Sequence, residues 1–306
     1  MHEARNASNR CCRHDHAGMR KSGGEDKTLF NCLKMTYVSL PDNNGTDRRL
    51  VFYLSMEEYA AEHLDELIGI RRGTSENSSS DGEKGAWNND GAFFIWQVAP
   101  TVIFGRNQDM NAEVNVPYCR EHGIAMYRRK SGGGCVFADK GNIMISYIRH
   151  CTDVAGLFAE YLEKLAAFLR SLGINAEVSG RNDVLVNGRK VSGNAFSLKP
   201  NGVGIVHGTF LYNLDFDTMS AAITPSRAKL ESKGVHSIEQ RVLNLKSVLD
   251  EKNIGLEALK SAIISYFCTD KIELTERQVA EISEIEKGYL DPSFINGHIG
   301  SSDDRL

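Results

Sequence analysis

The sequence predicts an α+β fold in which mixed or antiparallel β-sheets are flanked by helices. Across the middle of the chain, short runs of β-branched and aromatic residues follow one another, and only a few helical segments interrupt them. The pair Asn187-Gly188 lies between two such runs and is the strongest short signal for a β-hairpin. Strands that come in runs, instead of alternating with helices, are typical of α+β domains.

The composition is that of an ordinary globular protein. The 306 residues are 41% hydrophobic and 25% charged, and the formal net charge of -4 argues against a nucleic-acid binder that works by bulk electrostatics. No apolar run approaches the roughly 18 residues that a membrane span requires. The seven cysteines are odd in number and form no C-x-x-C pair, which indicates reduced thiols. We therefore expect a cytoplasmic protein without a membrane or nucleic-acid partner.

The first ninety residues predict a tail, one helix and a loop. Residues 1–34 are polar and lack periodicity, so we expect a disordered tail. From 47 to 70, apolar residues recur at helical intervals, which predicts a helix with Ser55 as its N-cap. Residues 71–91 are rich in Gly, Ser and Asn and predict a long exposed loop.

The remaining elements are predicted from period and turn chemistry. We expect one long amphipathic helix over 157–172, and helix-like segments over 256–267 and 279–285. The predicted strands are 93–98 paired with 101–105, then 124–127, 142–148, 184–186 paired with 190–195, and 195–197 paired with 205–211.

A basic and glycine-rich segment is the first candidate for chemistry. Arg128, Arg129 and Lys130 precede Ser131 and the three consecutive glycines 132–134. Consecutive glycines let successive N–H groups converge on an anion, and arginine adds a planar fork of donors for phosphate or carboxylate. A glycine-rich hairpin with a solvated basic edge is the alternative. The chain has no P-loop, no G-x-G-x-x-G and no G-x-S-x-G motif, so neither those phosphate folds nor a serine hydrolase is supported.

Four segments resemble signatures of the lipoate-protein ligase A family, in that family's order and spacing. They are R-R-K-S-G-G-G-C-V-F-A-D-K-G-N, G-R-N-D-V-L-V-N-G-R-K-V-S-G-N-A-F, V-H-G-T-F-L and K-G-V-H-S-I-E-Q-R-V-L-N-L. The resemblance covers residues 36–250, with a weaker similarity to 297. It implies a catalytic domain of the class II aminoacyl-tRNA synthetase and biotin ligase kind, followed by a C-terminal helical segment over 251–306 that is the remnant or start of an accessory domain.

The resemblance also implies the activity. Members of this family activate lipoate with Mg²⁺ and ATP to lipoyl-AMP and transfer the acyl group to a lysine. The implied acceptors are lipoyl domains of 2-oxo acid dehydrogenase E2 subunits and the glycine-cleavage H protein. This chemistry is sensible physically, because a carboxylate acylates poorly until it carries a good leaving group, and the resulting anhydride must be shielded from water.

Site residues follow from the family's motifs. Lys190 matches the lysine that contacts the adenylate phosphate and acyl carbonyl, and Asp183 matches a carboxylate that would help to place Mg²⁺. Arg128 is expected near the acyl carboxyl end, and His207 close to the adenylate. The further residues expected at the lipoyl-adenylate are Ser131, Gly132, Gly133, Gly134, Val136, Asn182, Ser192, Gly193 and Asn194.

Two departures from the family keep alternatives open. Ala138 stands where many members have histidine, so no role is transferred to that position. The sequence after 250 is shorter than the family's usual accessory domain, so the chain is expected to be truncated, to need a separate accessory protein, or to transfer lipoate from preformed lipoyl-AMP. Octanoyltransferases of the same superfamily use a cysteine thioester, and Cys135 is the cysteine nearest the glycine loop. We expect Cys135 to pack inward instead. A non-catalytic binder and a biotin ligase are disfavoured.

Overall fold

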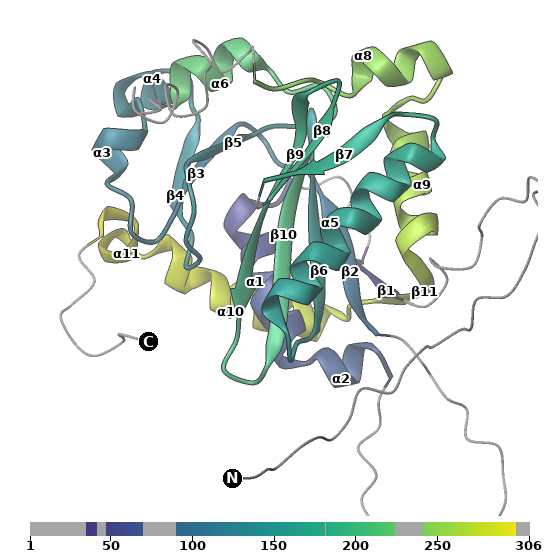
Figure 1. Cartoon of the computed structure of the whole chain (residues 1–306). Helices are drawn as coiled ribbons and strands as arrows, with labels where there is room; N and C mark the ends of the chain where they lie inside the picture. The colour runs from purple at the N-terminus through teal and green to yellow at the C-terminus, as the bar shows by residue number, and fades with distance from the viewer. Residues whose placement is uncertain (1–34, 42–46, 70–89, 181, 224–240, 298–306) are drawn as a thin grey trace, which may run out of the picture. The chain divides into compact units, whose positions relative to one another are not determined.

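Eight strands form one mixed sheet in the part of the chain that the structure describes (Figure 1). The structure is a computed structural model, and it describes residues 35–41, 47–69, 90–180, 182–223 and 241–297. Strands β1 and β11 pair in parallel, as do β1 and β2, and the other neighbours are antiparallel. Across the sheet the strands are β11 (Cys268–Glu273), β1 (Met35–Ser39), β2 (Gly91–Trp96), β6 (Asn142–His150), β10 (Val203–Leu211), β9 (Arg189–Leu198), β8 (Asp183–Val186) and β7 (Ala176–Ser179).

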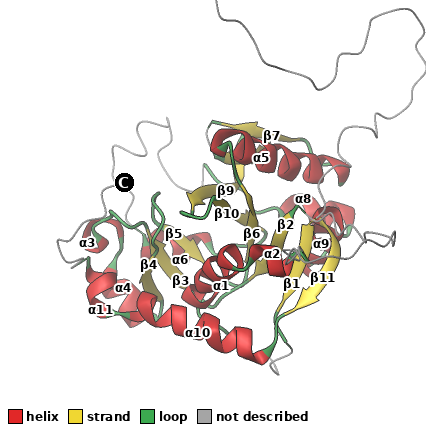
Figure 2. Cartoon of the chain, turned by 90° about the horizontal axis from the view of Figure 1, so that it is seen from below, coloured by secondary structure: helices red, strands yellow, loops and turns green. Residues whose placement is uncertain are grey.

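Helices cover both faces of this sheet (Figure 2). The central strands β6 and β10 are buried along nearly their whole length, as strands between two helical layers must be. Helices α5 and α9 pack on one hydrophobic core and α1 and α10 on the other. The helices are α1 (Leu50–Glu62), α2 (Leu64–Leu67), α3 (Met110–Glu113), α4 (Val116–Glu121), α5 (Val154–Ser171), α6 (Phe216–Ala222), α8 (Lys246–Leu249), the 3-10 helix η1 (Asp250–Lys252), α9 (Leu256–Phe267), α10 (Glu276–Leu290) and α11 (Pro292–Asn296).

A second, three-stranded sheet carries the glycine loop. Its strands, in order, are β4 (Ala125–Arg128), β3 (Thr101–Phe104) and β5 (Val136–Ala138). Strand β3 pairs in parallel with β4 and antiparallel with β5, so the segment 129–135 crosses from one edge of the sheet to the other. Helices α4 and α6 and this sheet enclose a third, smaller core. The loop is therefore anchored at both ends by strands.

Several sequence predictions are confirmed. The α+β class is correct, and the hairpin at Asn187-Gly188 joins β8 to β9 with φ values of 53° and 70°, which is the left-handed region that these two residues tolerate. The long amphipathic helix is α5, and the segment 256–267 is α9.

Two local predictions are wrong. Strand β2 does not pair with β3, because β2 lies in the large sheet beside β1 and β6 while β3 enters the small sheet. Ser55 is not an N-cap, since α1 begins five residues earlier and the Ser55 hydroxyl donates to the Val51 carbonyl within the helix. The predicted tail, and residues 71–89 of the predicted loop, lie outside the described residues.

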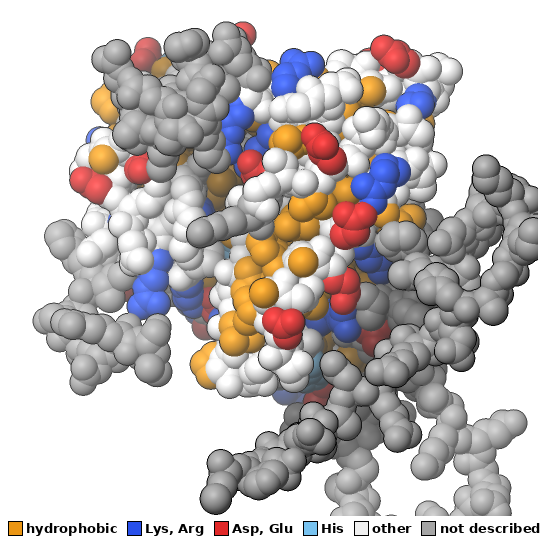
Figure 3. Space-filling view, in the orientation of Figure 1, with side chains coloured by type: hydrophobic (Ala, Val, Ile, Leu, Met, Phe, Trp, Pro, Cys, Tyr) orange, Lys and Arg blue, Asp and Glu red, His pale blue; other side chains and the backbone are white. Residues whose placement is uncertain are grey.

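The C-terminal part contributes more than helices. Strand β11 extends the large sheet, and α10 lies against α1 on the sheet's far side. Hydrophobic side chains also reach the surface on the face of the molecule that Figure 3 shows. The exposed large hydrophobic residues in the described ranges are Val154 of α5, Val178 of β7 and Leu198 of β9. Among the described helices, none is long and apolar enough to cross a membrane.

Candidate functional site

Strands β10 and β6 carry the site on the sheet face that α1 covers. Because side chains alternate along a strand, His207 and Thr209 of β10 point to the same face. The register pairs His207 with Ser146 of β6, which places Ser146 there too. Glu57 of α1 reaches this face and contacts both His207 and Ser146. Sheet alternation and helix packing therefore gather residues that are distant in the sequence.

A chain of buried hydrogen bonds runs across this face and ends at the glycine loop. Trp96 Nε1 donates to Ser146 Oγ (3.0 Å), and Ser146 Oγ donates to Glu57 Oε1 (2.6 Å). Glu57 Oε2 lies 3.2 Å from His207 Nδ1, and His207 Nε2 lies 3.2 Å from Ser131 Oγ. We call this series of bonds the acyl-end relay, because the resemblance described above leads us to expect the acyl part of a ligand beside Ser131. It joins β2, β6, α1 and β10 to Ser131.

The chemistry of the partners fixes the direction of each bond. Indole N–H only donates, so Ser146 accepts from Trp96 and uses its own proton on Glu57. A carboxylate only accepts, so the His207 proton lies on Nδ1 and, in the neutral ring, Nε2 accepts from Ser131. Glu57 is almost fully buried, with 4% of its side chain exposed. The Ser131 hydroxyl is therefore held by a rigid, fully bonded support.

Arg129 shapes the glycine loop from inside the protein. Its guanidinium donates to the carbonyl oxygens of Gly132 (2.9 and 3.1 Å) and Gly134 (2.7 Å). Burial lowers the pKa of Arg129 to about 10, which leaves it charged at neutral pH. Gly133 has a φ of +103°, and a Cβ there would lie 2.7 Å from Arg129 Nη2, so only glycine fits.

The loop's amides are open to a ligand. Among the hydrogen bonds of the described residues, the N–H groups of Gly132, Gly133 and Gly134 donate to no other group. The neighbouring carbonyls of Gly132 and Gly134 are meanwhile occupied by Arg129. Unpaired amides grouped in a glycine loop form a concave site for anions. The geometry thus supports an anion or a polarised carbonyl at this loop.

Arg128 is held by backbone carbonyls. Its Nη1 donates to Arg106 O and Gln108 O, each at 2.7 Å, and its Nε donates to Phe294 O at 3.0 Å. The residue is 3% exposed, and burial lowers its pKa. The guanidinium therefore lies between the segment 106–108 and the C-terminal end of α11, and it connects the two.

Lys190 lies at the other end of the same sheet face. Its Nζ is 2.8 Å from Asp183 Oδ1, and Arg241 Nη2 is 3.2 Å from Asp183 Oδ2. A Cβ on Gly193 would lie 2.3 Å from Lys190 Nζ, so the amine rests directly on the glycine backbone. All three charged side chains are partly buried. We call Lys190, Asp183 and Arg241 the phosphate-end triad, because the resemblance implies that Lys190 contacts the phosphate of an adenylate.

Thr209 links the two ends. Its Oγ1 accepts from the Gly193 amide at 3.1 Å, and Gly193 carries the Lys190 amine above it. His207 is two residues from Thr209 on the same strand, a separation of about 7 Å. The acyl-end relay and the phosphate-end triad therefore lie side by side, close enough for one extended ligand to contact both.

Ser192 and Asn194 lie on the opposite face of the sheet. A Cβ on Gly208 would lie 2.0 Å from Asn194 Oδ1 and 2.8 Å from Tyr161 Oη, which belongs to α5. The Ser192 hydroxyl contacts the Asn194 amide there. Asn194 Nδ2 donates to the Asn182 carbonyl, and Asn182 Nδ2 donates to the Asn194 carbonyl. These residues brace the turn before Asp183, and their side chains do not share the face of Lys190.

Apolar residues surround the acyl-end relay. Val136 is half-buried on β5 and packs against the same core as Trp96 and Ile103. Trp96 stacks on Tyr53, with ring centroids 4.7 Å apart. Cys135 packs against the third core and also lies near the Arg129 guanidinium. An apolar chain with a polar head fits this end of the face.

Sequence reasoning missed four residues of this arrangement. Glu57 and Trp96 lie in segments that showed only helix or strand signals, and no sequence signal distinguished the role of Arg129 from that of Arg128. The fourth residue is Asn142.

Asn142 is fully buried on the site's face of β6, and neither atom of its amide has a partner among the described residues. A buried polar group without a partner calls for water or a ligand. The only signal for Asn142 was its place in D-K-G-N.

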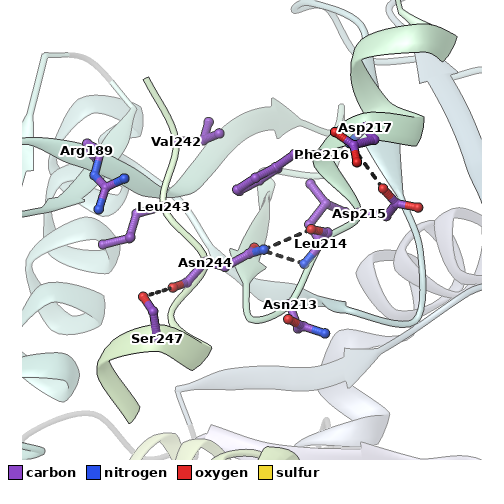
Figure 4. A pocket seen from close by; sticks show the side chains of 10 residues that line it. All are labelled: Arg189, Asn213, Leu214, Asp215, Phe216, Asp217, Val242, Leu243, Asn244 and Ser247. Carbon is purple, nitrogen blue, oxygen red and sulfur yellow. Dashed lines mark hydrogen bonds between the residues drawn. The ribbon is translucent and has the colours of Figure 1, made fainter. Parts of the chain in front are cut away.

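A cavity of about 810 Å³ lies between the segments 213–217 and 242–247, with Arg189 of β9 also in its lining (Figure 4). The Asn244 side chain bridges both backbone groups of Leu214 across it, at 2.8 and 2.9 Å. The segment also pairs with Lys190, whose backbone contacts Arg241 and Leu243 at 2.8 Å each. None of the predicted site residues lines this cavity.

The described residues do not form a metal site by themselves. No group of three or more His, Cys, Asp or Glu side chains in the described ranges is arranged to hold an ion. Each carboxylate oxygen of Asp183 lies beside a cation, although only Oδ2 accepts a hydrogen bond, from Arg241, and Oδ1 is buried without one in the described residues. The donor set therefore does not match a resident Mg²⁺, which needs free oxygen ligands.

This fold, with a glycine loop whose amides are open and a partly buried lysine on the same sheet face, is that of acyl-activating and acyl-transferring domains. The chain belongs to the family described as the lipoyl protein ligase A/B catalytic domain, which it matches over residues 74–268. It is therefore an enzyme of the lipoate-protein ligase class.

Curated relatives carry the same designation. The chain is 34% identical over 256 residues to lipoate-protein ligase LplJ of Bacillus subtilis, covering 81% of this chain and 70% of that protein. It is 35% identical to lipoate-protein ligase 1 of Staphylococcus aureus, covering 75% of this chain and 62% of the relative. The chain thus spans about two thirds of the length of these relatives.

Solved structures share the fold. A bipartite lipoate protein ligase of Thermoplasma acidophilum, described with its E2 lipoyl domain, superposes with a TM-score of 0.68 at 21% identity, covering 88% of this chain and 99% of that one. A lipoate-protein ligase A bound with ATP superposes with a TM-score of 0.65 at 20% identity, covering 86% of this chain and 99% of that one. At these identities the likeness concerns the fold.

Proposed function

We propose that the chain activates lipoate with ATP to lipoyl-AMP and transfers the lipoyl group to a lysine of an acceptor domain. The observation that carries this proposal is that the open amides of the glycine loop and the Lys190 amine border one sheet face. A mixed anhydride has a carbonyl and a phosphate next to each other, so it needs donors at two adjacent points. Family membership supports the same chemistry.

Each end of the face has a task in this proposal. The lipoyl chain occupies the apolar slot near Trp96 and Val136, with Ser131 and the loop amides at its polar head. Lys190 neutralises the charge that develops on the carbonyl and phosphate as the acceptor amine attacks. Gly193 has no side chain to hold the ligand away from Lys190. Asn182 supports Asp183 through its clasp with Asn194.

His207 and Arg128 act indirectly in this scheme. His207 positions the Ser131 hydroxyl, and Glu57 fixes the histidine's tautomer. Arg128 holds the Gly105–Gln108 segment that borders the loop. Ser192 supports Asn194 from the α5 face.

Mg²⁺ is proposed only as the counter-ion that arrives with ATP. Asp183 is the carboxylate closest to Lys190, and a metal there would have to replace Lys190 or Arg241 on its oxygens. Mg²⁺ commonly binds through one or two carboxylates together with substrate phosphates. No step of the proposed reaction is assigned to it.

The proposed acceptors are lipoyl domains of 2-oxo acid dehydrogenase E2 subunits and the glycine-cleavage H protein. A relative with the same fold was solved as a bipartite ligase with its E2 lipoyl domain, which supports a lipoyl domain as acceptor. That relative also supports a second possibility, in which adenylation requires a separate accessory protein.

Pyrophosphate release separates these cases. The purified chain is mixed with lipoate and Mg-ATP, and pyrophosphate is measured with and without an apo-lipoyl domain. Release that depends on lipoate supports adenylation by the chain alone. In a second assay, lipoyl-AMP is supplied directly and lipoylation of the apo-lipoyl domain is measured. Lipoylation in this assay, without pyrophosphate release in the first, supports a transferase that depends on a partner. Failure of both assays would contradict the proposed function.

A further inference from the structure

The glycine loop rests on helices that follow the family's catalytic region. The family match ends at residue 268, whereas α10 and α11 span 276–296. Both helices nevertheless contact the residues that begin the loop, Arg128 and Lys130. The loop's geometry therefore depends on a segment outside the recognised domain.

Arg128 forms the first of these contacts. Its Nε donates to Phe294 O (3.0 Å) and Ile295 O (3.1 Å), which are carbonyls at the end of α11. Gly297 N at the C-cap also donates to Phe294 O, at 3.2 Å, so the arginine adds a charged donor to the carbonyls at the helix end, where a cation is favourable. The Nη1 atom of the same guanidinium donates to Arg106 O and Gln108 O. The buried Arg128 side chain thus joins α11 to the segment 106–108, which borders the glycine loop.

Tyr289 of α10 forms the second contact. Its hydroxyl donates to Glu58 Oε1 at 2.5 Å, and Lys130 Nζ donates to Glu58 Oε2 at 2.9 Å. The Lys130 amine also lies 4.6 Å from the centre of the Tyr289 ring, within cation–π range. Tyr289 is 3% exposed. The carboxylate of Glu58 therefore ties α10 to the last cation before Ser131.

The two contacts bear on the open amides of Gly132, Gly133 and Gly134, because they hold the residues just before them. Arg129 N donates to Phe104 O (2.9 Å), and Arg106 N donates to Ser131 O (3.0 Å), so two backbone bonds fasten the first residues of the loop to the end of β3 and the segment that follows it. Arg128 and Lys130 flank Arg129 and are both held by the C-terminal helices. If either the Arg128 contact with α11 or the Lys130 contact with α10 is lost, the residues before Ser131 are held less firmly. The glycines that follow are conformationally permissive, so the loop becomes more mobile.

We propose that α10 and α11 act as a positioning element for the glycine loop, with Arg128 and Tyr289 as its positioning residues. Neither side chain needs to touch the substrate for this role, because each acts through the loop. The consequence for activity rests on the proposed function, whereas the consequence for loop order does not. The two can be measured separately.

Hydrogen exchange of the ligand-free protein tests loop order directly. The variants are Tyr289→Phe, which removes one hydroxyl, and Arg128→Lys, which keeps the charge and loses the fork. In peptides covering 104–108 and 129–137 we expect exchange about tenfold faster, because a hydrogen bond involving a charged group is lost. Peptides of α5 keep the parent rate. Arg277→Ala, which removes an exposed ion pair of α10 with Glu281, is the matched control.

The kinetic readout is the split between KM and kcat in lipoate-dependent pyrophosphate release. A looser loop raises KM for lipoate several-fold in both variants, while the control retains the parent KM. Unchanged loop exchange in Tyr289→Phe would overturn the proposal, as would exchange that rises equally in α5. Faster loop exchange in a protein without pyrophosphate release would uphold the positioning role and contradict the proposed function. If Arg128→Lys does not fold, Tyr289→Phe still decides.

Discussion

The two ends of the site face are built on opposite principles. The acyl-end relay is a buried series of hydrogen bonds in which Glu57, His207 and Ser131 all have partners. The phosphate-end triad is a set of partly exposed ion pairs, with Asp183 between Lys190 and Arg241. One end is rigid before any ligand arrives. The other keeps its cations neutralised by a carboxylate.

This difference indicates how a ligand is received. A neutral apolar acyl chain gains little from charge, so its end of the site needs shape and one fixed hydroxyl. A phosphate brings its own negative charge and can take over Lys190 and Arg241 from Asp183. In the proposed function, the triad therefore holds the cations in place until a phosphate arrives, and the relay sets where the acyl head lies.

Lys190→Ala is expected to have the largest effect, because in the proposed function Lys190 is the cation that neutralises charge on both the carbonyl and the phosphate. Loss of one such group costs about 10²- to 10³-fold in kcat. We expect that loss in both lipoate-dependent pyrophosphate release and transfer from lipoyl-AMP. Lys260→Ala, which breaks an exposed pair on α9, should retain parent rates. Normal turnover of the Lys190 variant would refute the assignment of the phosphate end.

Glu57→Ala is expected to have the next largest effect, on stability. It leaves the Ser146 hydroxyl and the His207 N–H buried without an acceptor, at about 1–3 kcal/mol for each group. Thermal unfolding should move down by several degrees, since about 2–4 °C corresponds to each kcal/mol in a domain of this size. Glu62→Ala on the exposed side of α1 is the control. An unchanged midpoint would mean that the relay is not a rigid support.

The same comparison explains what the sequence could predict. The Asn187-Gly188 hairpin and helix α5 follow from local chemistry and period, and both are correct. The separation of β2 from β3 could not be predicted, because sheet membership depends on partners that are distant along the chain. Strand β11 alternates exposed and half-buried residues and was missed for its weak apolar signal.

Site residues divide in a similar way. Lys190 and Asp183 lie in one hairpin, so a local motif brings them together. Glu57 enters only through the packing of α1 on β6 and β10, which no local pattern encodes. Arg128 and Arg129 are adjacent and identical in type, yet one holds α11 and the other holds the glycines. Only tertiary structure distinguishes two neighbours of this kind.

Glu58 of α1 makes the stability of the protein depend on pH, because its carboxylate accepts hydrogen bonds from Tyr289 and Lys130. Burial alone would raise the pKa of Glu58, but hydrogen bonds from Tyr289 and Lys130 outweigh it and hold that pKa below its ordinary value of 4.5. A carboxyl with a lowered pKa stabilises the fold above its unfolded pKa and loses that stabilisation as the pH falls through its folded pKa.

Glu58→Gln should therefore be less stable than the parent at pH 7, and the gap should narrow below pH 4.5. Urea unfolding at both pH values measures it, with Glu62→Gln as control. An equal gap at pH 7 and at acid pH would show that the Glu58 charge contributes nothing to the support.

Cys135→Ser is expected to have the smallest effect and tests whether the acyl end binds or reacts. Cys135 is half-buried and packs against the third core, and it interacts electrostatically with the Arg129 guanidinium. If the acyl group stays on AMP, the serine variant should transfer lipoate within about twofold of the parent, as expected for a small buried change. Cys151→Ser is the control. Abolished transfer together with an acyl-thioester on the parent would instead assign Cys135 as nucleophile, and the acyl end would then be a reacting centre.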